Sequence, residues 1–354
     1  MTRTSAYSLK DNRYLPQLDG LRAFAVIAVL AYHSHLPLTQ GGYVGVDVFF
    51  VLSGYLITTI LLTEISATGR IRFGVFYAKR ALRLFPALLL VCIVIAAVWA
   101  AVPWAPTREA TLVGVPAAIS YLSSWVRAFD LSTLGYLGHT WSLSVEEHFY
   151  LLWPLCLFLA IKITKHVRMS IVLIMVLAVV YQLIAPALGW SFDRVYNGSD
   201  TRAFQILIGC ALAALLPRLT RISLWAALIA VLALVAAFFF MPYESPIYLF
   251  GGAVVVGFAT AIIIGHVVLN ERRVTAFLSL RPFVWIGKRS YGIYLWHYPI
   301  FGILAASTLP FLLAAGLGVT FSIVIPALSY RYVESPFLRL KNRFARARKI
   351  AVEL

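Results

Sequence analysis

Residues 18–38, LDGLRAFAVIAVLAYHSHLPL, indicate both the class of fold and the place of a site. The segment is apolar and long enough to form a helix across a hydrocarbon core about 30 Å thick. It nevertheless contains Arg22 and two histidines, His33 and His35. Ionisable groups are costly inside a membrane and usually serve a function there. The segment therefore predicts a membrane span that carries part of a reactive site.

The composition of the whole chain is typical of an integral membrane protein. Of its 354 residues, 61% are hydrophobic and only 12% are charged, which excludes an ordinary soluble domain. We expect an all-α integral membrane protein with about ten transmembrane helices. The predicted spans are residues 21–38, 44–64, 84–102, 144–161, 170–188, 203–217, 223–241, 247–269, 290–307 and 310–332.

The distribution of basic residues predicts the orientation of these spans. With both termini in the cytoplasm, 26 of the 30 Lys and Arg residues fall on the inner side, in agreement with the positive-inside rule. The same bias explains the net charge of +16 without a nucleic acid partner. We predict a cytoplasmic tail over residues 1–12, a membrane domain over 13–335 and a basic cytoplasmic tail over 336–354.

The first two predicted spans bring polar side chains to a similar depth in the membrane. Arg22 and His33 are about three helical turns apart, so they share one face of the first helix. Asp47, counted down from the turn before the second span, reaches about the depth of His33, and we expect the two to pair. A structural clamp between helices is the alternative for this pair. Ser53 is a further candidate, although a helical serine also bonds to backbone carbonyls. Three glycines would let the two backbones approach closely: Gly41, Gly42 and Gly45.

The segment KRALRLFPA places Arg80 and Arg83 three residues apart, on one side of a helix start. Guanidinium groups at the inner membrane boundary suit the phosphates of a cytosolic ligand, because they donate bidentate hydrogen bonds. Ordinary positive-inside anchoring explains the two arginines equally well.

The segment GHTWSLSVEEHFYLLWP opens the fourth predicted span. Ser144 and Glu147 have the spacing of a capping box, which would give Glu147 a structural task. Glu146 points elsewhere on the helix, and we expect it at the outer end near His33, in substrate contact or proton transfer. Trp141 is one of several aromatic residues that suit either sugar rings or a membrane interface.

Later segments add further polar candidates. His297, in SYGIYLWHYPI, lies within the ninth predicted span, either in a site or in a hydrogen-bonded knot between helices. Tyr291 belongs to the same motif. Arg202 enters the sixth span from the outer side, and we expect it to pair with Asp200.

Five motifs together resemble the acyltransferase family 3 membrane proteins. They occur in the family's order and extend from about residue 13 to 335: LDGLRAFAVIAVLAYH, GGYVGVDVFFVLSGYLIT, RALRLFPA, WSLSVEEHFYLLWP and SYGIYLWHYPI. One residue departs from the pattern. His148 follows the paired glutamates, where many family members have glutamine.

The resemblance implies a membrane O-acyltransferase. Family members transfer an acyl group, usually acetyl, from cytosolic acyl-CoA to a hydroxyl on an extracytoplasmic acceptor such as a bacterial surface glycan. It also implies that Arg22 and His33 are essential and that Arg80 and Arg83 help to bind the donor. The implied location is the cell inner (plasma) membrane, with acyl-CoA as co-substrate, membrane lipid around the helices, and no bound cofactor or metal.

These expectations combine into a mechanistic hypothesis. The donor phosphates dock on the arginines from the inner side, and the thioester reaches His33 between the helices. His33, held by Asp47, accepts the proton of the acceptor hydroxyl as a general base. A covalent acyl-histidine is the alternative.

Other functions remain open at this point. The acceptor could be a small molecule such as a macrolide or a glycolipid. A proton-coupled transporter or flippase would also place ionisable groups in the membrane, although the sequence has no visible repeat symmetry. A non-catalytic scaffold would leave the intramembrane polar residues without a task.

Overall fold

The computed structural model describes residues 14–102, 107–164, 166–270 and 276–340. Within these ranges the secondary structure is helical, with no strand, as the composition predicts. The α-helices are α1 (Pro16–His33), α2 (Gly45–Thr68), α3 (Phe73–Ala101), α4 (Arg108–Ile119), α5 (Ser123–Ala128), α6 (Trp141–Ile163), α7 (Val167–Ile184), α8 (Phe192–Asn197), α9 (Ser199–Leu215), α10 (Leu224–Phe240), α11 (Ala253–Leu269), α12 (Arg281–Ala305) and α13 (Phe311–Ser329).

Seven helices of the described ranges are long and apolar enough to cross a membrane: α2, α3, α6, α7, α9, α11 and α13. Each coincides with a predicted span. The other three predicted spans coincide with α1, α10 and α12. Of these, α10 has only 17 residues, whereas α1 and α12 carry more polar and charged side chains. Ten crossings, the cytoplasmic termini and the tail boundaries remain predictions.

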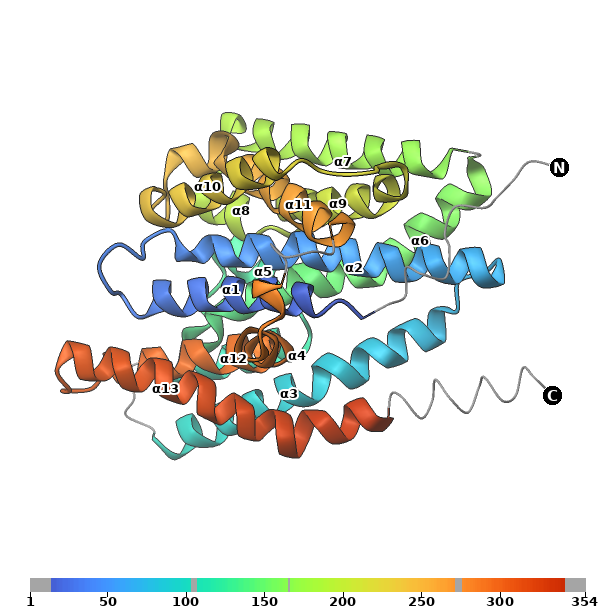
Figure 1. Cartoon of the computed structure of the whole chain (residues 1–354). Helices are drawn as coiled ribbons and strands as arrows, with labels where there is room; N and C mark the ends of the chain where they lie inside the picture. Colours follow the sequence, from blue (N-terminus) through green and yellow to red (C-terminus); the bar gives the residue numbers. More distant parts are fainter. Residues whose placement is uncertain (1–13, 103–106, 165, 271–275, 341–354) are drawn as a thin grey trace.

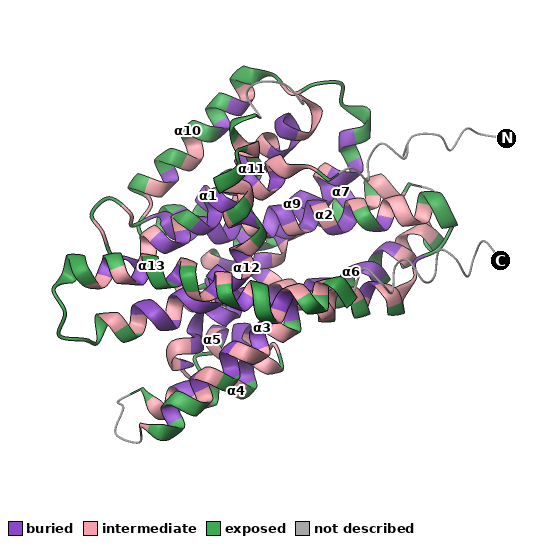
Figure 2. Cartoon of the chain, turned by 60° about the horizontal axis from the view of Figure 1, so that its bottom comes forward, coloured by how far each residue is buried: buried purple, intermediate pink, exposed green. Residues whose placement is uncertain are grey.

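The central helices of the bundle are α1, α2, α9 and α12. In Figure 1, α1 and α2 run side by side, with α9 and α11 on one side of them and α12 and α13 on the other. α1 packs on α12 and α2, and α2 packs on α9. Figure 2 shows buried residues gathered on these central helices and exposed residues on α7, α10 and α13. Many of the exposed residues are large and apolar, including Leu173, Ile229 and Leu312, as expected for helices that face lipid.

Glycines allow α1 to pack closely on both of its neighbours. A Cβ atom on Gly42 or Gly45 would collide with a carbonyl oxygen of α1, which confirms the close approach predicted for these two glycines. The same prediction was wrong for Gly41, because a Cβ there would collide with the carbonyl oxygen of Ala237 on α10. On the opposite side, a Cβ on Gly287 of α12 would collide with the carbonyl oxygen of Asp19. Small residues at helix crossings let backbones touch in this way.

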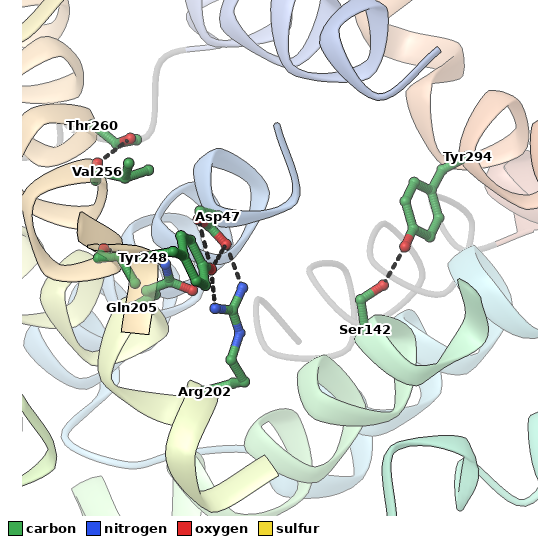
Figure 3. A network of polar contacts seen from close by, with 9 residues as sticks. Asp47, Ser142, Arg202, Gln205, Tyr248, Val256, Thr260 and Tyr294 are labelled. Carbon is green, nitrogen blue, oxygen red and sulfur yellow. Dashed lines mark hydrogen bonds and ion pairs between the residues drawn. The ribbon is translucent and has the colours of Figure 1, made fainter. Parts of the chain in front are cut away.

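A buried polar clamp joins α2, α9 and the start of α11. Asp47 on α2 is completely buried, and Arg202 on α9 is 2% exposed. Arg202 donates to the Asp47 carboxylate and to the Tyr248 hydroxyl oxygen, while that hydroxyl donates to both Asp47 oxygens at 3.0 Å (Figure 3). Tyr248 begins a kinked segment, Tyr248–Gly252, that precedes α11 and in which Gly251 has a positive φ of 138°. The rings of Tyr196 and Trp141 lie 4.8 and 5.5 Å from the guanidinium carbon.

We predict that Asp47→Ala destabilises the fold, because it leaves the buried Arg202 without its counterion. Removing one partner of a buried ion pair costs about 3–5 kcal/mol of unfolding free energy. The change is measured as the thermal midpoint of the purified protein in detergent. Glu109→Ala, at an exposed position, is the control and should leave the midpoint unchanged. An Asp47→Ala protein as stable as this control would contradict a clamp role.

We also predict that Gly287→Ala destabilises the contact between α1 and α12. The added methyl group meets the Asp19 carbonyl oxygen, and overpacking of this kind costs about 1–3 kcal/mol. Gly316→Ala is the matched control, since a Cβ there meets nothing within 4 Å. Thermal unfolding should separate the two variants, and equal midpoints would rule out a tight crossing at Gly287.

Candidate functional site

A small cavity of about 140 Å³ lies among α1, α2, α3, α6 and α12. Three arginines from two helices line it, namely Arg22 of α1 and Arg80 and Arg83 of α3, so we refer to it as the arginine cavity. The sequence motifs predicted these residues individually as donor-binding candidates, and the fold brings them together. A site with three guanidinium groups is suited to an anionic ligand.

A wider cavity of about 520 Å³ adjoins the arginine cavity. Arg22, Arg83 and Tyr291 line both, so these side chains form the boundary between the two spaces. The wide cavity lies between the start of α1, the start of α12 and the segment after α13. A ligand with a bulky anionic head and a thin arm fits such a wide chamber that leads into a narrow one.

Glu146 belongs to the arginine cavity and not to the surroundings of His33. It accepts a hydrogen bond of 2.6 Å from Ser53, which in turn accepts one of 3.0 Å from Tyr150. The guanidinium of Arg80 lies 4.3 Å from the centre of the Tyr150 ring. The expected place of Glu146 beside His33 was wrong, because α6 begins at Trp141. Five residues of helix separate Glu146 from that end, about 7–8 Å of rise.

The predicted capping box at Ser144 and Glu147 was also wrong. α6 begins three residues before Ser144, with Thr140 at its N-cap. The Ser144 hydroxyl donates to the carbonyl oxygen of Thr140 at 3.2 Å. One carboxylate oxygen of Glu147 is buried without a hydrogen-bond partner among the described residues. Glu147 therefore has no capping task.

A cluster of three histidines lies where α1 ends. The rings of His33 and His297 are 4.8 Å apart, and those of His139 and His297 are 5.5 Å apart. Tyr298 contacts His33 and His139 at 5.3 and 4.9 Å. His139 is 3% exposed and His297 is completely buried, whereas His33 is partly exposed. Within this cluster, His33 is the ring that a reactant can reach.

Backbone carbonyls fix the tautomers of the histidines. In His33, Nδ1 lies 3.0 Å from the carbonyl oxygen of Val29. A carbonyl oxygen only accepts hydrogen bonds, so a neutral His33 carries its proton on Nδ1 and keeps a lone pair on Nε2. In His297, Nδ1 is similarly bonded to the carbonyl oxygen of Tyr294, and the buried Nε2 has no partner among the described residues. The fold thus presents basic nitrogen atoms at the cluster.

A hydrogen bond between Ser142 and Tyr294 lies on the wall of the arginine cavity nearest to His297. Both residues line the cavity, and their hydroxyl oxygens are 2.6 Å apart (Figure 3). The Tyr294 ring lies 5.2 Å from the ring of His297. The cavity therefore ends two ring contacts from His33, so one site contains both an anion-binding and a basic part.

The predicted pair of His33 and Asp47 was wrong. Asp47 bonds to Arg202 and Tyr248, on the α9 and α11 side of α2, whereas His33 packs on α12. Counting residues from the turn gives the depth of each side chain but not its direction around the helix. The expected pair of Arg202 and Asp200 was wrong for a related reason, since Asp200 binds Arg194 at 2.6 and 2.9 Å.

Two other predicted candidates, Trp141 and Tyr291, have clear positions, as does His148, the residue that departs from the family pattern. Trp141 is buried against Arg202 in the clamp, so its ring is not available to a sugar. Tyr291 lines both cavities, and its hydroxyl donates to the carbonyl oxygen of Leu84 at 2.9 Å. His148 bonds to the Ser199 hydroxyl at 2.8 Å and does not line the arginine cavity.

Sequence reasoning missed four residues of the site: His139, Tyr150, Tyr294 and Glu334. The first three lie within or beside the quoted motifs. These motifs contain many polar and aromatic residues, and nothing in the sequence distinguished these three from their neighbours. Glu334 lines the wide cavity, is 5% exposed and ends a π-helical turn, Tyr330–Glu334. Such turns often mark functional sites, but the sequence alone does not reveal one.

Comparison with known proteins finds relatives that cover most of this chain. Peptidoglycan O-acetyltransferase OatA of Listeria monocytogenes is 37% identical over 97% of this chain. The putative peptidoglycan O-acetyltransferase YrhL of Bacillus subtilis is 35% identical over 93%, and O-acetyltransferase OatA of Staphylococcus aureus is 34% identical over 92%. The chain spans only 56–58% of the length of these relatives. No solved structure matches the chain significantly.

The family is shown by a match over nearly the whole chain. Residues 15–331 match the profile of acyltransferase family 3, which describes an acyltransferase domain. This range includes the three arginines of the cavity and the three clustered histidines. The chain is a multi-pass membrane protein and belongs to acyltransferase family 3.

Proposed function

We propose that this chain transfers an acetyl group from cytosolic acyl-CoA to a hydroxyl of an extracytoplasmic glycan, in the cell inner membrane. The observation that supports this most directly is the arginine cavity, which begins at a wide chamber and ends beside three histidines. The relatives are peptidoglycan O-acetyltransferases by name, which favours a cell-wall glycan as the acceptor.

The arginines suit the phosphates of the donor. Arg22 and Arg83 stand at the boundary of the two cavities, and Arg80 lies deeper, against Tyr150. A nucleotide head in the wide chamber would meet the first two, while the pantetheine arm would enter the narrow space. Glu146 and Ser53 offer hydrogen-bonding oxygens along the way, which suit the amides of that arm.

His33 is the proposed general base. Its Nε2 accepts the proton of the acceptor hydroxyl as the hydroxyl oxygen attacks the thioester carbon. The carbon–sulfur bond then breaks, and the CoA thiolate takes the proton from His33. The thioester would pass the Ser142–Tyr294 contact to reach this ring, so we propose that this contact opens during turnover.

The proposal is tested with the purified protein in lipid nanodiscs, acetyl-CoA and fragments of peptidoglycan. Mass spectrometry should find acetyl esters on the glycan together with an equal amount of free CoA. The absence of both products would contradict the proposal. Movement of the glycan across liposomes without use of acetyl-CoA would instead indicate a transporter.

We predict that His33→Gln reduces the transfer rate by at least about 10²-fold, which is the usual contribution of a general base. The variant should fold normally, because the lost side-chain bond is to the carbonyl of Val29 in the same helix. His166→Gln, at an exposed position, is the control. Transfer at the wild-type rate in the His33 variant would remove His33 from the mechanism.

We predict that Arg83→Lys raises the KM for acyl-CoA about tenfold with a smaller effect on kcat. Lysine keeps the charge but loses the bidentate hydrogen bonds of a guanidinium, and a bond to a charged group contributes about 1.5–3 kcal/mol. Arg218→Lys, at an exposed position, serves as the control. If both variants had the KM of the wild type, Arg83 would be a membrane anchor and not a phosphate ligand.

A further inference from the structure

Partly exposed tyrosines surround His33 outside the arginine cavity. Tyr32 meets the His33 ring edge-on at 4.8 Å, and Tyr298 does so at 5.3 Å. Tyr243 lies 6.4 Å from Tyr32. All three rings are partly exposed, and none of them lines the arginine cavity. This approach to His33 is therefore separate from the proposed donor route and is rich in aromatic faces.

Arg127 on α5 is the cation beside this approach. Its guanidinium donates a long hydrogen bond of 3.5 Å to the carbonyl oxygen of Gly138. A Cβ on Gly138 would lie 3.5 Å from the Tyr298 hydroxyl, and Gly138 directly precedes His139. Arg127 is also close enough to Tyr32 and Tyr243 to act on them electrostatically. Arg127 thus lies beside the residues that surround His33.

Arg127 is weakly held compared with the other three arginines predicted on the outer side. Arg194 binds Asp200 through two bonds of 2.6 and 2.9 Å. Arg202 is locked in the clamp with Asp47. Arg108 donates to the carbonyl oxygen of Trp99 at 3.1 Å.

The ion partner of Arg127 is Asp193, at 3.6 Å. The Arg127 side chain is 25% exposed, and that of Asp193 is 50% exposed. An exposed pair at this distance contributes little to stability, so a stronger anionic ligand can displace Asp193 at low cost. The asparagine Asn197 donates to Asp193 at 2.8 Å and gives the displaced carboxylate a partner.

We propose that Arg127 binds an anionic group, a carboxylate or a phosphate, on the glycan acceptor and thereby holds the acceptor hydroxyl beside His33. A sugar ring packs on the aromatic faces of the tyrosines. Asp193 remains ion-paired with the Arg127 guanidinium until the acceptor binds and displaces it. This inference rests on the proposed function, which supplies the glycan as the acceptor. Arg127 is a specificity residue in this account, and it does not touch the reacting atoms.

The test compares acceptors that differ only in charge. The disaccharide of N-acetylglucosamine and N-acetylmuramic acid carries one carboxylate, and its methyl amide is the neutral match. N-acetylglucosamine 1-phosphate supplies the phosphate arm. Binding to the full chain in nanodiscs is measured by calorimetry, and acetyl transfer is measured by mass spectrometry. The variants are Arg127→Gln, Asp193→Asn and, as a charge-loss control at an exposed position, Arg221→Gln.

The expected result is tighter binding of the charged acceptor than of its neutral match by about tenfold, the worth of a charge-assisted hydrogen bond. Arg127→Gln should abolish this difference and bind the neutral amide as the wild type does, whereas Arg221→Gln should keep the difference. Asp193→Asn should bind the charged acceptor several-fold more tightly. The carboxylate and phosphate arms identify which anion is preferred.

Two outcomes would overturn the inference. Equal binding of charged and neutral acceptors by the wild type would exclude an anion site. Parallel losses in Arg127→Gln and Asp193→Asn would indicate a structural brace between α5 and α8. Charge-selective binding without transfer would support Arg127 while contradicting the proposed function. Acetyl transfer without charge-selective binding would support the proposed function and contradict the inference about Arg127.

Discussion

The contact between α1 and α12 is the constraint on which the site depends. α1 carries Arg22 and His33, and α12 carries Tyr291 and His297. At one end the crossing is set by Gly287 against the backbone of α1, and at the other the rings of His33 and His297 touch at 4.8 Å. A change in the distance or angle of this crossing would move the anion-binding and the basic parts of the site together. The two helices act as one rigid support.

Three neighbouring helices, α2, α3 and α6, complete this support in different ways. α3 and α6 add Arg80, Arg83 and Glu146 to the same cavity. α2 contributes Ser53 to the cavity and, on its opposite face, Asp47 to the clamp with α9. A completely buried carboxylate between helices requires a counterion. The clamp therefore keeps α2 in place while its other face remains available for ligand.

The sequence predicted the helical membrane fold and the members of the arginine cavity well, because length, apolarity and charge distribution are local properties. It failed where direction around a helix mattered. Asp47 has the expected depth, yet it points to Arg202 and not to His33. Glu146 was misplaced because the start of α6 could not be located from a capping pattern. Glu334 lies in a π-helical turn and Tyr248 in a kinked segment before α11. Both features change the face on which a residue lies, and neither has a simple sequence signal.

The hydrogen bond between Ser142 and Tyr294 also bears on the energetics of the cell. A polar passage from one side of a membrane to the other would conduct protons and dissipate the electrochemical gradient. Each elementary charge that crosses releases about 2.3 kcal/mol per 100 mV. The paired hydroxyls, 2.6 Å apart, bond to each other on the cavity wall nearest to His297 and so leave no free polar group there for a chain of water molecules. A membrane protein with a cavity inside its helical bundle can in this way remain electrically silent.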